Sequence, residues 1–394
     1  MDFTIPSHLV RMRDDVREFI RARVLPEAGV RELAAEPLAR FAWDWVEELS
    51  RMGLRTLALP REYGGAGGDV LACCVLAEEL GAGDLGLAVA LDQTWKLTPF
   101  ISDAATPAVR ARFLDAFVTN HRFLMGAGSS EPAAGSDQSL PFNQPGAGAR
   151  STAVREGEGW VLNGEKSPIS NGGVASLYIL TARSAPGTGG AEGLTAFYVP
   201  ADAAGFSVAH VYDKSGQRLN MNALLQFSDC RLPDALVLGE PGMAGAAMGR
   251  TLRNRGFPQA GACVLGVARA AYEDALEFAR QRIQGGTAII HHPNVAMLLA
   301  EMNASIEAAR TLIWRAAWEC DQGGQNDGRL QIQSKVVASE TAFRVAESAL
   351  RVVGRWATLK GGPPVEKYLR DASSFLHSDG QNEILLLKVG RALA

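Results

Sequence analysis

The stretch WVLNGEKSPISNG, residues 160–172, begins the part of the chain that decides the fold. Its first three residues are typical of a β-strand, and Asn163–Gly164 predicts a tight hairpin turn, because both turn residues would need positive φ. Further short β-rich runs follow at residues 178–180, 195–199, 208–211 and 224–227. This pattern predicts a compact antiparallel β domain, a barrel or a sandwich, which we place at residues 123–236.

Helical periodicity flanks this β domain on both sides. Before it, apolar residues such as Leu9, Met12 and Val16 recur every three or four positions and predict an N-terminal helical domain over residues 1–122. After Pro241 the same period returns, and small residues such as Ala342 allow close helix packing. We therefore expect an α+β fold in which a C-terminal four-helix bundle occupies residues 237–394.

The composition narrows the function classes. The 394 residues are 47% hydrophobic and carry a net charge of -4, so no basic surplus favours nucleic acid or an anionic membrane surface as a partner. The five cysteines are scattered without C-x-x-C spacing, and the N-terminus has no apolar run of signal-peptide length. We expect a cytoplasmic protein without a disulfide framework or a metal site.

Three polar segments are candidates for chemistry. Residues 128–137 combine hydroxyls, glycines and free backbone N–H groups that suit a polar ring or a phosphate. Residues 162–172 predict a hairpin followed by a second turn. Taken alone, each segment also fits an ordinary solvated turn. His377 and Asp379 lie between two helical stretches, where an aspartate either caps the next helix or takes part in catalysis. The sequence lacks H-E-x-x-H, G-x-S-x-G and Walker motifs.

Several motifs occur together in a recognisable order. The chain carries P-R-E-Y-G-G at residues 60–65, S-E-P-A-A-G-S-D at 130–137 and N-G-E-K-S-P-I-S-N-G at 163–172. Q-R-I-Q-G-G follows at 281–286 and R-D-A at 370–372. With a helical domain, a β domain and a helical bundle in this order, the chain resembles the acyl-CoA dehydrogenase family over nearly its whole length.

The resemblance implies FAD as the cofactor. Ser130 and Ser170 match hydroxyl residues that contact the flavin in the family. Arg282 matches an arginine whose charge neutralises the FAD pyrophosphate of a neighbouring subunit. Gly354 and Gln381 fall at further cofactor-binding positions, although Gln381 replaces a threonine. The shared cofactor also implies a homodimer or a homotetramer built through the bundle.

The resemblance also implies the substrate side of the site. Ser136 corresponds to a serine that lines the path of the thioester, and Gly380 and Asn254 fall at further substrate-binding positions. Around Asn254 the aspartate and arginine that flank coenzyme A in many relatives are missing. We therefore keep two handles for the acyl group open, coenzyme A and the phosphopantetheine of a carrier protein, together with a substrate that has no thioester.

Asp379 is the predicted catalytic base. It lies seven residues after Ala372, where the family's E-G-T motif has the glutamate that removes the α-proton of an acyl thioester while a β-hydride passes to the flavin. The aspartate side chain is one methylene shorter, about 1.5 Å by bond length. The resemblance thus implies dehydrogenation of an acyl thioester, with an electron-transfer flavoprotein or oxygen as the acceptor.

Two alternatives remain open at this stage. Nitroalkane oxidases of the same superfamily use an aspartate base on a small acidic compound without coenzyme A, which suits Asp379 and the altered residues around Asn254. The other alternative is a flavin-binding scaffold without turnover, because Pro168, Pro293, Arg351 and Arg355 all replace residues that contact the cofactor in the family. The retained carboxylate argues against this second alternative.

Overall fold

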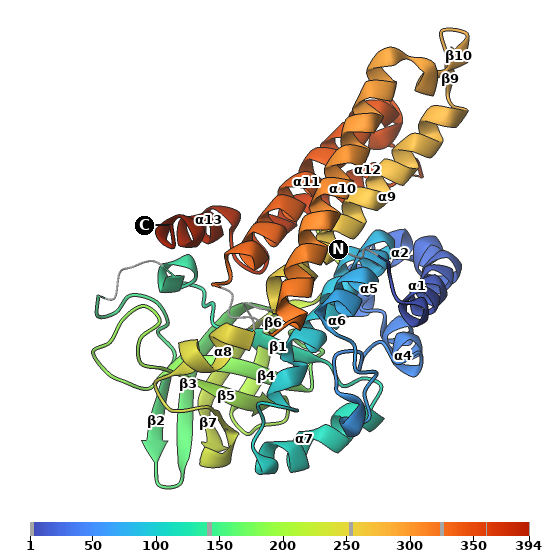
Figure 1. The fold of residues 1–394 in the computed structure, drawn as a ribbon. Helices are drawn as coiled ribbons and strands as arrows, with labels where there is room; N and C mark the ends of the chain where they lie inside the picture. The colour runs from blue at the N-terminus through green and yellow to red at the C-terminus, as the bar shows by residue number, and fades with distance from the viewer. Residues whose placement is uncertain (1–3, 140–143, 252–254, 324–326, 360, 394) are drawn as a thin grey trace.

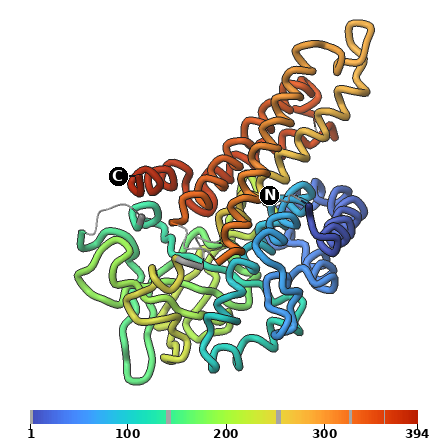
Figure 2. The backbone as a smooth tube through the Cα atoms, in the orientation of Figure 1, coloured from blue at the N-terminus to red at the C-terminus, as the bar shows by residue number. Residues whose placement is uncertain are grey.

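The structure is a computed structural model that describes residues 4–139, 144–251, 255–323, 327–359 and 361–393. Figure 1 shows N-terminal helices and a β-sheet side by side, and a long helical bundle that projects away from both. The last helix, α13, lies on one side of the base of the bundle and the N-terminal helices lie on the other (Figure 2). None of the helices in these described ranges is long and apolar enough to cross a membrane.

The N-terminal helices surround two that are buried almost completely. In chain order the α-helices of this N-terminal part are α1 (Ser7–Phe19), α2 (Leu25–Arg31), α3 (Pro37–Arg40), α4 (Trp43–Arg51), α5 (Val70–Gly83), α6 (Leu85–Leu97) and α7 (Pro107–Thr119). The buried pair is α5 and α6, and each begins at an aspartate, Asp69 or Asp84, whose side chain accepts a hydrogen bond from a backbone N–H of the first turn. A helix that is apolar on all sides needs such burial.

The middle strands form one sheet, with the path β6-β7-β3-β2-β4-β5-β8 and β1 paired to β4. The strands are β1 (Met125–Gly128), β2 (Thr152–Glu156), β3 (Gly159–Ser170), β4 (Leu177–Arg183), β5 (Leu194–Pro200), β6 (Phe206–Val211), β7 (Asn222–Pro233) and β8 (Val237–Leu238). Most pairs are antiparallel as predicted, but β1 and β2 both pair with β4 in parallel. No pairing among the described residues joins β6 to β8, so the predicted closed barrel is not confirmed.

The predicted hairpin turn at Asn163–Gly164 is wrong. Both residues lie inside β3, at a register shift against β7, and the connection between β2 and β3 is at Gly157, whose φ is 61°. Gly164 has φ 129°, and a Cβ there would lie 2.7 Å from the Cα of Ser151. Glycine is thus required by a bulge and a close backbone approach rather than by a turn.

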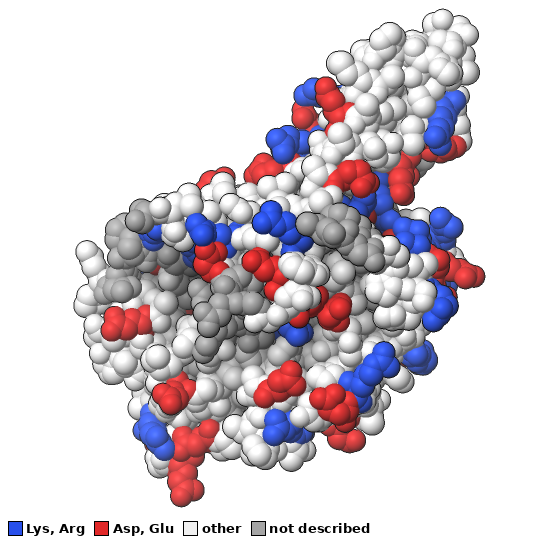
Figure 3. Space-filling model, in the orientation of Figure 1, with Lys and Arg blue, Asp and Glu red and all other residues white. Residues whose placement is uncertain are grey.

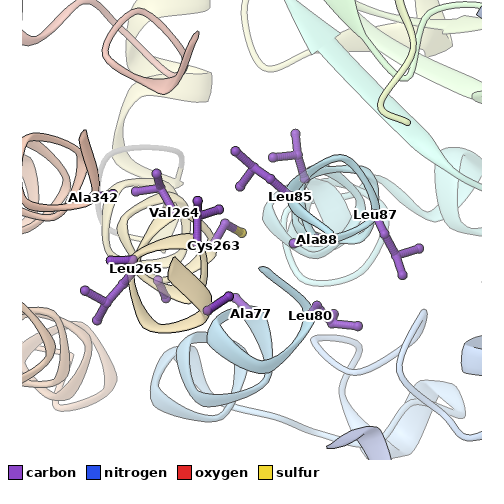
Figure 4. Packing of buried hydrophobic residues seen from close by; sticks show 14 of the residues in the cluster. Ala77, Leu80, Leu85, Leu87, Ala88, Cys263, Val264, Leu265 and Ala342 are labelled. Atoms are coloured by element: carbon purple, nitrogen blue, oxygen red, sulfur yellow. The ribbon is translucent and has the colours of Figure 1, made fainter. Parts of the chain in front are cut away.

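The C-terminal part is helical as predicted. Its helices are α8 (Ala244–Thr251), α9 (Phe257–Gln281), α10 (Pro293–Asp321), α11 (Arg329–Val353), α12 (Val365–Phe375) and α13 (Asn382–Arg391), with a small β9 (Ile283–Gln284) and β10 (Thr287–Ala288) ribbon after α9. Cys263, Val264 and Leu265 of α9 lie in the core beside α5 and α6 (Figure 4).

The contact between α5 and α9 is close enough to require glycine. A Cβ at Gly81 would lie 2.0 Å from the carbonyl oxygen of Cys263, and one at Gly266 would lie 2.3 Å from that of Glu78. The two helices therefore meet through their backbones. This packing fixes α6, which follows α5 directly, against the start of the bundle.

Candidate functional site

A cavity of about 1280 Å³ lies where the three parts of the chain meet. Its wall comes from α6, from the loop after β1, from the end of β3, from residues 212–217, from the start of α9 and from residues 374–388. Pockets for single small ligands usually measure about 300–1,000 Å³. This cavity therefore has room for a large cofactor beside a substrate.

The two motif segments of the β domain meet at this wall. Ser130 and Ser136 from the loop after β1 line the cavity, as does Ser170 at the end of β3. The backbone N–H of Ser167 donates to the carbonyl of Ser130 at 2.9 Å, which joins the loop to the strand. The structure thus brings together the three serines that the sequence predicts.

Glu131 anchors this loop. Its carboxylate accepts from the backbone N–H groups of Arg150 at 2.6 Å and Ser151 at 3.1 Å, and it pairs with Lys166 Nζ at 2.6 Å. Burial opposes its ionisation, but Lys166 and these hydrogen bonds outweigh burial and lower the pKa of Glu131. A carboxylate engaged in this way holds the loop rather than reacting with a ligand.

Asp379 lies in the loop between α12 and α13 and faces the cavity. Its side chain is 23% exposed, and both it and Gly380 have positive φ, 52° and 102°. Helix α13 has Gln381 as its N-cap residue and no side-chain capping bond, so Asp379 does not cap this helix. Gly380 and Gln381 also line the cavity, as predicted for a site at this loop.

A buried lysine holds this loop in place. Lys335 Nζ, on α11, donates to the carbonyls of Phe375 at 3.2 Å and Gly380 at 2.9 Å and to Asn382 Oδ1 at 2.8 Å. Burial is the main reason that the pKa of Lys335 falls to about 8. Three acceptors on one amine fix the backbone on both sides of Asp379.

The carboxylate of Asp379 meets α6. Lys96 Nζ lies 3.2 Å from Oδ1, and Gln93 Nε2 makes a long hydrogen bond of 3.5 Å to the same oxygen. Lys96 Nζ also lies 2.5 Å from Asp92 Oδ2, and both members of this pair are buried. Burial opposes the charge of Lys96, but Asp379 and Asp92 outweigh it and raise the lysine pKa.

The remaining predicted residues lie elsewhere. Arg282 directly follows α9 and is exposed, as is Gly354 directly after α11. Helix α9 has 25 residues and starts at Phe257, on the cavity wall, so Arg282 lies about 37 Å away along the helix. Neither residue lines the cavity of its own chain. Asn254 lies outside the described residues.

Sequence reasoning missed Asp92, Gln93, Lys96 and Lys335. A signal for the first three exists, since α6 reads L-G-L-A-V-A-L-D-Q-T-W-K-L and places an aspartate four residues before a lysine within an apolar helix. Such spacing puts both side chains on one face. Among the described residues, no group of three or more His, Cys, Asp or Glu could hold a metal ion.

Family models match the chain in three consecutive parts. The N-terminal domain of acyl-CoA dehydrogenase matches residues 7–121, its middle domain residues 126–230 and its C-terminal domain residues 245–394. An acyl-CoA dehydrogenase of Bacillus subtilis is 30% identical over 99% of this chain and 98% of its own length. The chain belongs to the acyl-CoA dehydrogenase family.

Solved structures agree with this assignment. Butyryl-CoA dehydrogenase from Megasphaera elsdenii is 30% identical, with a TM-score of 0.90 and full coverage of both chains. The prolyl acyl carrier protein oxidase AnaB is 25% identical, with a TM-score of 0.85 over 99% of this chain and 100% of its own. Members of the family are FAD-dependent oxidoreductases that act on CH–CH bonds, and the protein is a flavoenzyme of this class.

Proposed function

We propose that the protein dehydrogenates an acyl thioester by removing the α-proton with Asp379. The observation that carries this proposal is the placement of Asp379, whose carboxylate is exposed to a large cavity and held from behind by α6. Oδ1 contacts Lys96 and Gln93, whereas no hydrogen bond to Oδ2 is found among the described residues. Oδ2 is thus the oxygen available to a proton.

The flavin belongs at the β-domain side of this cavity. Ser130 and Ser170 offer hydroxyls there, and Gln381 adds an amide. FAD, when bound, would supply the acceptor for the β-hydride. Asp379 would take the α-proton, and the substrate would gain a double bond. Ser136 and Gly380 line the same cavity, and we assign them to the thioester. We also assign Asn254 to the substrate side, on the family resemblance alone.

Arg282 and Gly354 serve the cofactor of a second copy in this proposal. They lie too far along the bundle to reach the cavity of their own chain, and the outer end of the bundle presents few charged side chains in Figure 3. Ile283 and Met297 at this end are each 61% exposed. An exposed apolar surface favours contact between copies, so we propose a homodimer or a homotetramer.

The acyl carrier and the electron acceptor complete the proposal. Coenzyme A and a carrier protein both remain candidate handles, since this chain is similar to relatives named for each. Electrons leave to an electron-transfer flavoprotein or to oxygen. We also propose a cytoplasmic location, because Cys73, Cys74, Cys230 and Cys263 are free thiols.

Anaerobic mixing with substrate panels tests the proposal. Acyl-CoA thioesters and acyl groups on carrier proteins should bleach the flavin absorption bands, and nitroalkanes should not. Bleaching by nitroalkanes alone would establish an oxidase that uses an aspartate base. A flavin that no compound bleaches would favour a binding protein without turnover.

Replacement of Arg282 tests the shared cofactor. Arg282→Ala should weaken FAD binding about 10-fold to 100-fold, because a pyrophosphate would lose a charge-assisted partner worth about 1.5–3 kcal/mol. Arg280→Ala is the matched control, since Arg280 lies two residues earlier and is also exposed. FAD titration of the two apoproteins measures the difference, and light scattering of the loaded protein should give a mass above the 41.9 kDa of one chain. Equal FAD affinity of the two variants would remove Arg282 from the cofactor site.

A further inference from the structure

One face of α6 gives the cavity an unusual wall. Val89, Gln93 and Lys96 follow one another at spacings of four and three residues, and all three line the cavity. The rest of the helix is buried, and it is apolar apart from Asp92 and Thr94. A charged residue in such a helix is expensive to bury unless it is paired. Its place beside Asp379 therefore needs an explanation beyond packing.

The cost of burying Lys96 is met by a dedicated counter-ion. Asp92 Oδ2 lies 2.5 Å from Lys96 Nζ, one helical turn away, and neither side chain is more than 2% exposed. Lys96 Nζ lies closer to Asp92 than to Asp379, whose Oδ1 is 3.2 Å away. Asp92 thus supplies the nearest counter-charge and holds the ammonium group at the cavity wall.

Lys96 contacts Asp379 from α6, whereas Asp379 itself lies in the loop between α12 and α13. The loop backbone is fixed through Lys335 on α11, whereas the carboxylate is contacted at Oδ1 by Lys96 and Gln93 of α6. Without the α6 contacts, rotation about the Cα–Cβ bond would let the carboxylate turn away. With them, one oxygen of the carboxylate is held against α6.

We propose that Lys96, held by Asp92, is a positioning residue that fixes Oδ1 of Asp379 on α6 so that Oδ2 faces the substrate. The inference rests on the proposed role of Asp379 as the base. It explains why a side chain one methylene shorter than glutamate suffices, since the carboxylate is oriented by a cation rather than by a longer arm.

Removal of the whole ion pair tests this role. Lys96→Met alone would leave Asp92 buried without a partner and endanger folding. The double variant Asp92→Asn/Lys96→Met removes both charges, and it should fold and bind FAD. We expect its maximal rate of anaerobic flavin reduction by butyryl-CoA to fall about 10-fold to 100-fold, because the carboxylate loses its orientation. The concentration of butyryl-CoA at half-maximal rate should change less than about twofold, because binding is not affected.

Two further variants complete the comparison. Asp92→Asn alone keeps Lys96 but removes its nearest counter-ion, so its rate should lie between those of the wild type and the double variant. Glu78→Gln/Arg310→Met removes another buried pair, 2.7 Å apart and outside the cavity wall, and should leave the rate unchanged.

Crystal structures of the FAD-loaded wild type and double variant give a readout that needs no substrate. The carboxylate of Asp379 should leave Gln93 in the double variant. An unmoved carboxylate would overturn the proposal, and so would a wild-type reduction rate. If Asp379→Asn reduces its flavin at the wild-type rate, the proposed base is wrong. The role of Lys96 is still tested in that case, because the two crystal structures compare the position of the Asp379 carboxylate with and without Lys96.

Discussion

Two neighbouring helices, α5 and α6, carry buried carboxylates, and these carboxylates differ in the number of cations around them. On α5, Glu79 accepts two hydrogen bonds each from Arg17 and Arg269, at 2.6–3.0 Å. Glu78 likewise accepts two from Arg310. Burial opposes the ionisation of Glu79, but the guanidinium groups outweigh it and lower its pKa. Each of these carboxylates is paired with arginines on both of its oxygens, so we call the group the matched cluster. The pairs join α1, α9 and α10 to α5.

The charges around α6, those of Asp92, Lys96 and Asp379, form an unmatched cluster with two carboxylates and one cation. Among the described residues, Asp92 and Asp379 both form their ion pair with the same cation, Lys96. Burial, with a further contribution from Asp379, raises the pKa of Asp92 to about 7 against the attraction of Lys96. The comparison teaches that a carboxylate saturated by arginines serves the fold, whereas one left short of cations at a cavity wall stays available for chemistry.

The largest expected effect is on catalysis at the unmatched cluster. Asp379→Asn keeps the size of the side chain and can still accept from Lys96, but it removes the proposed base. Flavin content and melting temperature should stay near wild type, while flavin reduction slows about 10²–10⁴-fold. Stopped-flow measurement of flavin bleaching decides the point. A wild-type rate would place the base elsewhere.

The matched cluster should respond in stability instead. Glu79→Ala leaves the partly buried Arg269 without its bidentate partner and should lower the free energy of unfolding by about 3 kcal/mol. Glu273→Ala is the matched control, since the 61% exposed Glu273 contacts the same arginine at 3.9 Å and should cost less than about 1 kcal/mol. Urea unfolding measures both. A large loss of flavin reduction per bound FAD in Glu79→Ala would contradict the division between the two clusters.

Lengthening the base should give a smaller effect. Asp379→Glu adds about 1.5 Å to the arm, so the carboxylate cannot both contact Lys96 and keep its place at the cavity. We expect about a tenfold slower flavin reduction on the native substrate. Unchanged kinetics would mean that the position of this carboxylate does not set specificity.

A further effect concerns the pH dependence of stability. The pKa of Asp92 is about 7 when folded and about 3.9 when unfolded, so between these values the folded state holds a proton that the unfolded state has released. The contribution of Asp92 to stability is therefore lost as pH rises from about 4 to about 7. Asp92→Asn should show a smaller fall in unfolding free energy between pH 5 and pH 8. Parallel pH profiles of the two proteins would count against a raised pKa.

Local sequence pattern was enough to predict the order of helical and β-rich segments along the chain. Apolar periods of three to four residues predict the helices, and short β-rich runs predict the strands, because these signals depend on neighbours in sequence. The same locality explains the error at Asn163–Gly164. An Asn-Gly pair favours a turn by itself, but pairing of β3 with β7 and the approach of Ser151 decide that it forms a bulge.

Motifs and a count of residues were enough to predict that Ser130, Ser136, Ser170 and Asp379 belong to one site, and all four line the same cavity. The tertiary structure alone decided what surrounds Asp379. Gln93 lies 286 residues before it in the chain, and Lys96 comes three residues after Gln93. An aspartate four residues before a lysine looks the same on a solvated helix. Whether the pair is buried depends on how α5 and α9 pack, and that packing places the lysine against a distant loop.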